Sequence, residues 1–401
     1  MDKIKIKFTF EVKLFLFFII LNFVDMAFNL QLKVYYFLVP IILIYILRNI
    51  GFSKKLGTFF FIYLLYILVL AFLGALNGNY YIYLYYDLIA FSSIFFALII
   101  LKFNLKYFYQ YYLPRFGVYI NAIAIVFTLY YISKYGFTVA SIEEGRGLND
   151  VREGQLMSPK AFLGVSLLIY PLVSYIIKSK FAWFYHISIF LHIFFSLAMA
   201  SRGTTIVGII VFVLTYMHIK KIKLNFHLFV NLKFYLYIVG ILLVSVIFYQ
   251  IPAIASATDY LLFRFTTESL GKGRTLEATT ILNSLTTNEL MFGKGLGASN
   301  TYWIFKHVKN GVNNAHYGWI FLILKGGVIF VVFIYGKILF SIFRLFKISK
   351  FAPYAICLIA FLMLEYAHTN FNNFLQLSWL FTLLFASNIA YEEKKNSSIT
   401  Y

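Results

Sequence analysis

The chain has 401 residues, of which 62% are hydrophobic and only 12% are charged. Soluble domains carry about twice that share of charged residues, so the composition excludes an ordinary soluble protein. The net charge is +20 at pH 7, but the basic residues lie mainly in short loops between apolar runs, where they signal membrane orientation. We therefore expect no nucleic-acid binding. A single cysteine, Cys357, excludes an intrachain disulfide and a cysteine metal site.

Apolar runs of transmembrane length recur along the whole chain. Lipid offers the backbone no hydrogen-bond partners, so such runs must form helices. They lie at 12–30, 34–50, 57–76, 83–101, 116–133, 161–178, 181–200, 204–219, 234–251, 316–341, 351–368 and 372–390. We predict an all-α, polytopic membrane protein with about twelve transmembrane helices, in which residues 1–401 form a single integral membrane domain.

Clusters of lysine and arginine predict the orientation of these helices. The clusters that fall on one side are Lys3/Lys5/Lys7, Lys54/Lys55, Lys102/Lys106/Arg115, Lys178/Lys180, Lys220/Lys221/Lys223, Arg344/Lys347/Lys350 and Lys394/Lys395. The positive-inside rule makes that side cytoplasmic, with both termini inside. The loops 134–160 and 252–315 then lie outside the membrane, together with the short turn at Arg202.

Three arginines and one histidine are thereby predicted to face the same compartment. Arg202 lies in a polar turn between two apolar runs, and Arg264 and Arg274 lie in an amphipathic stretch of the large outer loop. A guanidinium fork matches phosphate oxygens in pairs, which favours an anion clamp at the headgroup plane. The alternatives are a snorkelling arginine for Arg202 and solvated charges for the other two.

His316 directly precedes an apolar run. Its imidazole titrates near neutral pH and suits a general base, although a lone histidine at a helix entry is also a common interfacial residue. Tyr302 and Tyr317 flank it in sequence and fit either sugar stacking or an aromatic belt. Asn313 and Asn314 lie just before it.

The other outer loop and a glycine run complete the candidates. Arg146 and Arg152 lie in loop 134–160 among acidic residues; such a loop is either solvated or contributes arginines to a glycan cleft. The run at 293–297, GKGLG, lacks the phosphate-loop spacing, so a turn that lets the loop fold back is favoured over a ligand site. No acidic pair or histidine spacing typical of a metal site occurs, and we predict neither metal nor cofactor.

In combination, these residues resemble the superfamily of bacterial O-antigen polymerases and O-antigen ligases. The resemblance covers roughly 196–335 and rests on Ser201-Arg202-Gly203, on Arg264 and Arg274 followed by the glycine run, and on Asn-Asn-Ala-His316-Tyr317 followed by Lys325-Gly326-Gly327. The family commonly has asparagine after the histidine and an acidic residue before the later glycine. Here Tyr317 and Lys325 stand at those positions.

The resemblance implies a GT-C-like fold and a metal-independent glycosyltransferase in the bacterial inner membrane, with an active site that faces the periplasm. Donor and acceptor would be glycans on undecaprenyl pyrophosphate. Arg202, Arg264 and Arg274 would stabilise the departing pyrophosphate, and His316 would deprotonate the attacking sugar hydroxyl. A chain-length regulator and a flippase are the protein partners that the resemblance implies.

Three functions fit this reading. A polymerase would join repeat units into O-antigen or capsular polysaccharide, as part of lipopolysaccharide or polysaccharide biosynthesis, and this is the function we favour. A ligase would transfer the glycan to lipid A-core with the same clamp and base. A lipid-linked oligosaccharide flippase would need charges that line a path inside its spans. The few charges that we place in mid-span are Lys325, Glu365 and Asp25, whereas the main candidates lie outside.

Overall fold

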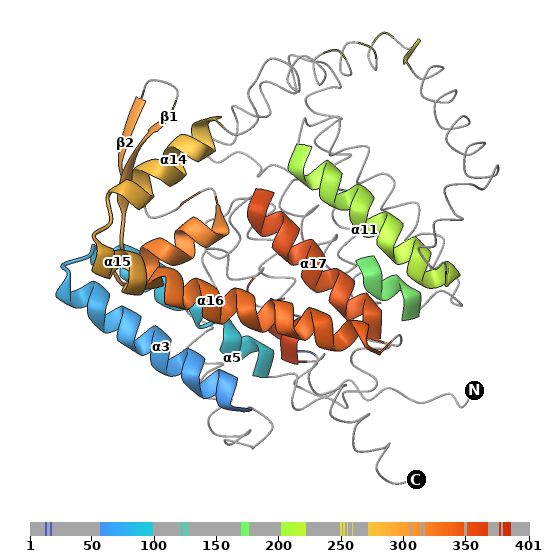
Figure 1. Cartoon of the computed structure of the whole chain (residues 1–401), viewed down its shortest axis with the longest axis horizontal. Helices are drawn as coiled ribbons and strands as arrows, with labels where there is room; N and C mark the ends of the chain where they lie inside the picture. Colours follow the sequence, from blue (N-terminus) through green and yellow to red (C-terminus); the bar gives the residue numbers. More distant parts are fainter. Residues whose placement is uncertain are drawn as a thin grey trace.

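The computed structural model describes residues 57–98, 170–175, 202–221, 272–304, 307–312, 317–348, 351–367 and 380–385, together with a few single positions. These residues are helical except for one β-hairpin (Figure 1). They include most or all of five predicted spans. The other predicted spans lie wholly or mainly outside the described residues.

The first described unit is a helical hairpin made of α3 (Gly57–Leu76) and α4 (Tyr81–Phe91), which α5 (Ser93–Leu98) continues. The uninterrupted apolar sequence of α3 ends at a short polar turn, where Gly78 has a φ of 67°. Glycine tolerates this left-handed conformation and commonly ends helices. The predicted span at 83–101 is interrupted at Ser92, whose hydroxyl donates to the Ile89 carbonyl at 2.7 Å.

The C-terminal unit contains the longest described helix, α16 (Gly318–Phe346), followed by α17 (Ala352–Ala367). The helix α16 is broken at Gly327, where φ is 71° and ψ is −178°. We call residues 325–327 the helix break. Between the two units in the sequence lie the 3₁₀ helix η5 (Tyr170–Tyr175) and α11 (Arg202–Lys220).

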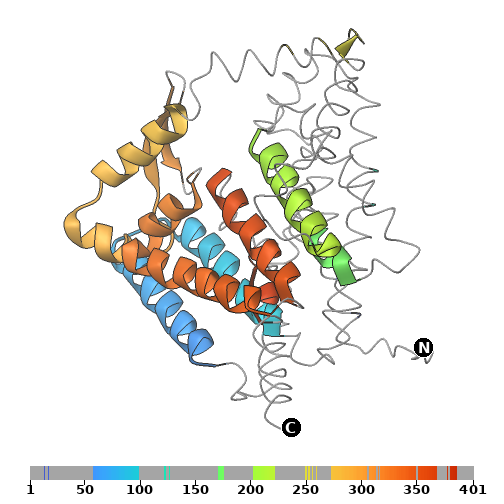
Figure 2. The ribbon, with the colours of Figure 1, turned by 45° about the vertical axis from the view of Figure 1, so that its right-hand side comes forward.

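The helices α3, α16, α17 and α11 follow one another across the molecule in two views (Figure 1, Figure 2). Aromatic rings join α3 to α16: Phe59 stacks on Phe333 with centroids 5.0 Å apart, and Tyr66 stacks on Phe330 at 5.1 Å. The helix α17 packs on α16, α11 and η5. The core therefore consists of apolar faces of helices, as in a bundle.

The surface of α3 indicates what surrounds the bundle. Phe61, Leu65, Leu68 and Phe72 form a stripe at helical spacing and are 54–65% exposed. The opposite face of the same helix is buried. An apolar helix with one uncovered apolar face is expected in lipid and is unusual in water.

Among the described residues, α3 (from Thr58) and α16 are long and apolar enough to cross a membrane. The expectation of a helical membrane protein is thus supported at this coarser level. The count of twelve spans and the positions of the termini depend on residues outside the described part.

The polar segment predicted as the outer loop 252–315 contains regular structure in its described portion. It comprises α14 (Lys272–Asn283), α15 (Thr287–Phe292) and an antiparallel hairpin of β1 (Asn300–Ile304) and β2 (His307–Val312). An all-α fold did not anticipate this hairpin. The bulge between Asn300 and Tyr302 interrupts its register, and α14 packs on β1.

Candidate functional site

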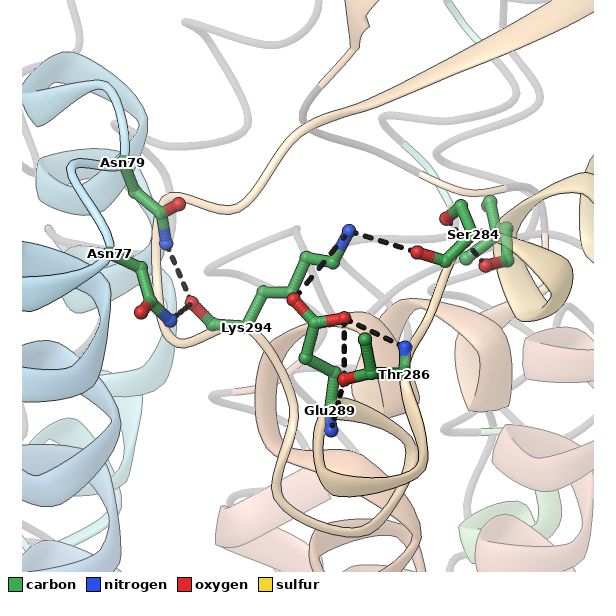
Figure 3. Close-up of polar contacts among 7 residues, drawn as sticks. Asn77, Asn79, Ser284, Thr286, Glu289 and Lys294 are labelled. Atoms are coloured by element: carbon green, nitrogen blue, oxygen red, sulfur yellow. Dashed lines mark hydrogen bonds and ion pairs between the residues drawn. The ribbon is translucent and has the colours of Figure 1, made fainter.

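The glycine run at 293–297, which we call the glycine loop, packs against the turn that joins α3 to α4. The Asn79 side-chain amide donates to the carbonyls of Lys294 and Leu296, each at 2.9 Å. The Asn77 amide donates to the Lys294 carbonyl at 3.0 Å (Figure 3). Both segments are predicted to lie on the outer side, and their contact agrees with that common sidedness.

Glycine is required in this loop for two reasons. Gly293, Gly295 and Gly297 have φ values of 79°, 84° and 78°, which side-chain-bearing residues rarely adopt. In addition, a Cβ on Gly295 would overlap the backbone of Gly74 in α3, and one on Gly293 would overlap the backbone at Lys325. The prediction of a turn that folds the segment back is confirmed.

Backbone N–H groups of the glycine loop donate hydrogen bonds to carbonyls of the protein itself. The N–H groups of Lys294 and Gly295 donate to the carbonyls of Leu324 and Lys325 at 2.9 and 3.0 Å, and the N–H of Leu296 donates to the Leu70 carbonyl at 2.9 Å. A phosphate loop keeps such groups for its ligand. The geometry therefore agrees with a structural role for the glycine loop.

A buried ion pair lies directly behind this loop. The ammonium of Lys325 is 2.8 Å from a carboxylate oxygen of Asp87 in α4, and the two side chains are 0% and 3% exposed. The same carboxylate accepts from the Gly297 N–H at 2.7 Å, and Lys325 donates to the Ala298 carbonyl at 2.6 Å. Phe321 lies 5.1 Å from the ammonium, at cation–π distance. Partners on several sides offset the cost of burying two charges.

A second, partly exposed polar group surrounds the side chain of Lys294 in the glycine loop (Figure 3). Thr286 and Glu289 form a capping box at the start of α15, and the Lys294 ammonium lies 3.9 Å from Glu289. The hydrogen bond from the Thr286 N–H to the Glu289 carboxylate lowers the pKa of that carboxyl, and the Lys294 charge contributes. These contacts shape the turn between α14 and α15.

Arg274 lies on α14, a helix that packs on both β1 and α16. It is partly buried, and Glu277, which is 2% exposed, lies three residues further along the same helix. Residues three apart share a helix face. Ala278 and Ile281 of α14 are buried as well, whereas Leu276 is 51% exposed. The described part of this amphipathic stretch thus turns its Arg274 side toward the protein.

Tyr317 is the N-cap residue of α16 and stacks on Trp319, with ring centroids 6.2 Å apart. It is partly buried, and its neighbour Ala315 is only 2% exposed. The entry of this helix is therefore a packed position. Tyr302 lies on β1, opposite Lys309, so its strand belongs to the same group of elements as α14 and α16.

Arg202 is the first residue of α11, as the predicted turn before a span requires. Phe212, in the second half of that helix, stacks on Tyr170 of η5. Because η5 lies beside the lower half of α11, the helix begins at the end of the bundle where α14 lies (Figure 1). Its main described contacts are with α17 and η5.

The structure thus brings α14, β1 and the start of α16 together, and with them the backbone positions of Arg274, Tyr302 and Tyr317. The remaining predicted residues lie outside the described part of the chain. They are His316, Arg264, Arg146, Arg152, Asn313 and Asn314. His316 is nevertheless flanked on both sides by described, packed residues.

Sequence reasoning missed Asp87, the partner of Lys325. A usable signal existed, because an acidic residue inside an apolar run is costly unless it is paired. Sequence alone also offered no reason to connect Asn77 and Asn79 with a loop more than 200 residues later. Comparison of the chain with protein family models, curated proteins and solved structures finds no match.

Proposed function

We propose that the protein is a glycosyltransferase of the bacterial inner membrane that polymerises undecaprenyl-pyrophosphate-linked repeat units on the periplasmic side. The observation that carries the proposal is the packing of the outer segment. The glycine loop hydrogen-bonds to α3 and α16, and α14 packs on β1 and α16. We take α14, α15, the glycine loop and the β1–β2 hairpin together as the outer cap of this enzyme. His316 follows them in the sequence and precedes the start of α16 by two residues.

The chemistry follows from the residue types. His316 takes the proton of the acceptor sugar hydroxyl, whose oxygen bonds to the anomeric carbon of the donor glycan. The bond from that carbon to the pyrophosphate breaks, and undecaprenyl pyrophosphate leaves with the bonding electrons. Arg202, Arg264 and Arg274 stabilise the charge that accumulates on the leaving group. General-base assistance of this kind typically contributes about 10²–10⁴-fold.

Charge placement favours an enzyme over a flippase. The buried charges Asp87 and Lys325 hold each other and the glycine loop, so they are engaged in packing and do not line a path for a polar glycan. The GT-C-like arrangement, with substrate reaching the site through the lipid, needs no soluble domain. A ligase would use the same clamp and base, and the experiment below separates the two.

The test uses a strain that lacks the gene, complemented with wild type, His316→Ala or Arg274→Lys, and displays the lipopolysaccharide on a gel. Matched controls are His218→Ala and Arg344→Lys, at described positions of α11 and α16 away from the cap. We expect the wild type and both controls to restore the ladder. The two test variants should leave only core carrying a single repeat unit.

Other outcomes contradict parts of the proposal. Loss of all glycan addition, with long lipid-linked polymer accumulating, would identify a ligase. An intact ladder with His316→Ala would exclude this histidine as the base. Full function of Arg274→Lys would exclude a two-pronged phosphate contact at this arginine, since lysine keeps the charge but lacks the planar fork.

A further inference from the structure

The break in α16 is completed by residues from two other parts of the chain. In an unbroken helix, the carbonyls of Leu324, Lys325 and Gly326 would accept from the N–H groups four residues later. The first two instead accept from Lys294 and Gly295 of the glycine loop. The third accepts from the Tyr66 hydroxyl of α3 at 3.0 Å.

The ion pair between Asp87 and Lys325 also connects the helix break to α4. Asp87 joins α4 to Lys325 and, through the Gly297 N–H, to the glycine loop. Lys325 joins α16 to the Ala298 carbonyl, two residues before β1. The side chains of Asp87 and Lys325 thus connect α4 and α16 to each other and to the residues just before β1.

The part of α16 before the break links Lys325 rigidly to the start of the helix. The helix α16 begins at Gly318, and the seven residues from there to Lys325 span about 10 Å at 1.5 Å per residue. His316 precedes Gly318 by two positions in the sequence. The intervening side chains Ile320, Phe321, Leu322 and Leu324 are at most 1% exposed. Movement of Lys325 relative to α4 would therefore move the helix entry relative to α14 and β1.

We propose that Asp87 and Lys325 are positioning residues that hold the entry of α16, and with it His316, at the correct distance from the outer cap. This inference rests on the proposed function. It assigns neither residue a contact with substrate. Misplacement of a catalytic group by about 1 Å can cost about 10²-fold in rate, so loss of the pair should act on turnover more than on substrate binding.

The first experiment measures kcat and KM in proteoliposomes, with the lipid-linked repeat unit extracted from the deletion strain as substrate. The variants are Asp87→Asn, Lys325→Met and the double variant. A single substitution leaves one buried charge without its partner, whereas the double variant removes both charges. We expect the double variant to restore the amount of folded protein, while kcat stays about 10²-fold below wild type and KM changes by less than about threefold.

The second experiment does not depend on activity. It reports the position of the glycine loop, which belongs to the outer cap, relative to the turn between α3 and α4. Cysteines replace Asn77 and Lys294, because the Asn77 side-chain amide donates to the backbone carbonyl of Lys294 at 3.0 Å. A short bifunctional thiol reagent then joins the two cysteines. Cys357 is buried and gives little background. We expect rapid cross-linking in the otherwise wild-type chain and cross-linking at least several-fold slower with Asp87→Asn/Lys325→Met.

The outcomes separate the two proposals. If kcat of the double variant returns to wild type together with the folded amount, or if cross-linking is unchanged, the positioning role is wrong while the polymerase proposal stands. If wild-type protein forms no polymer from the extracted substrate, the proposed function fails and the positioning role fails with it.

Discussion

The helices α3 and α16 have similar apolar sequences, yet they do different things in the molecule. The helix α3 is continuous and turns an apolar stripe outward, with Phe61 and Phe72 each 65% exposed. The helix α16 is broken at Gly327 and buries the charged side chain of Lys325 completely. Hydropathy detects both as spans and gives no hint of this contrast.

The difference shows where information about a site resides in such a protein. A lipid-facing helix needs only length and apolar composition, because its surroundings are uniform. A broken helix needs partners for its exposed carbonyls, since an unsatisfied backbone group in the hydrocarbon region costs several kcal/mol. Those partners come from segments distant in the sequence. The place where they meet is therefore the part of the fold in which we look for a site.

The largest effect is expected from substitution at the break. Gly327→Val places a β-branched residue at a φ of 71°, and its Cβ overlaps the Met291 carbonyl. We expect loss of more than about 4 kcal/mol of stability, measured as the fraction that stays monodisperse in detergent on heating. The control is Gly336→Ala in the same helix, where the added Cβ meets no atom within 4 Å. Equal stability of the two variants would contradict a required break.

The next effect tests the buried ion pair between Asp87 of α4 and Lys325 of α16. Asp87→Asn or Lys325→Met alone should cost about 3–5 kcal/mol, because each leaves a buried charge without its main partner. The double variant should cost less than either single one. Unfolding by SDS titration in mixed micelles measures all three. A double variant as unstable as the sum of the singles would show that the two residues do not interact.

A smaller effect compares the two faces of α3. Leu70 is 1% exposed and Leu68 is 65% exposed. Leu70→Ala should cost about 2–3 kcal/mol through a cavity. Leu68→Ala should cost under about 1 kcal/mol, because lipid refills the space. The same micelle titration applies, and a larger cost for Leu68→Ala would place protein, not lipid, against this stripe.

The Tyr66 hydroxyl, which donates to the Gly326 carbonyl at the helix break, should contribute less to stability. Tyr66→Phe keeps the stacking on Phe330 but removes the donor to the Gly326 carbonyl. We expect a loss of about 1–2 kcal/mol, since the carbonyl is left without this donor. Tyr80→Phe at an exposed position is the control and should be neutral. A neutral Tyr66→Phe would mean that the carbonyl finds another donor.

The smallest effect concerns α15, which packs against the break. Thr286→Ala removes the capping hydroxyl and should cost about 0.5–1 kcal/mol at neutral pH. The lowered pKa of Glu289 means that its capping contribution is present above the pKa of the unfolded chain and is lost as pH falls through the folded pKa. The Thr286 hydroxyl also donates to this carboxylate at 3.0 Å, so the stability difference between wild type and Thr286→Ala should narrow below about pH 4.3. A constant difference would exclude coupling to this carboxyl.

Parts of this fold were predictable from local sequence. The span at 57–76 coincides with α3, and the spans at 204–219 and 351–368 match α11 and α17 within two residues, because lipid imposes one simple pattern. The turn at the glycine run was predictable since three alternate glycines favour unusual φ values. The hairpin at 300–312 was not, because its short strands depend on packing against α14, and strand preference is set largely by context.

The candidate site was predictable only in outline. Charge clusters indicated one common side for Arg202, Arg274 and His316, which is a property of local composition. The contact between Asp87 and Lys325 depends on tertiary structure, because the two residues are 238 positions apart in the sequence. No periodicity within either helix records such a pairing.

The hydrogen bond from Tyr66 to Gly326 spans 260 residues, and this separation constrains the order of assembly. When the ribosome releases α3 into the bilayer, the segment that will need its hydroxyl has not been synthesised. The α16 segment must then enter lipid either as a continuous helix that breaks later, or only when α3 and the returning loop are already beside it. Completion of the fold therefore waits for the last third of the chain, and chains truncated before it lack both the glycine loop and the helix break.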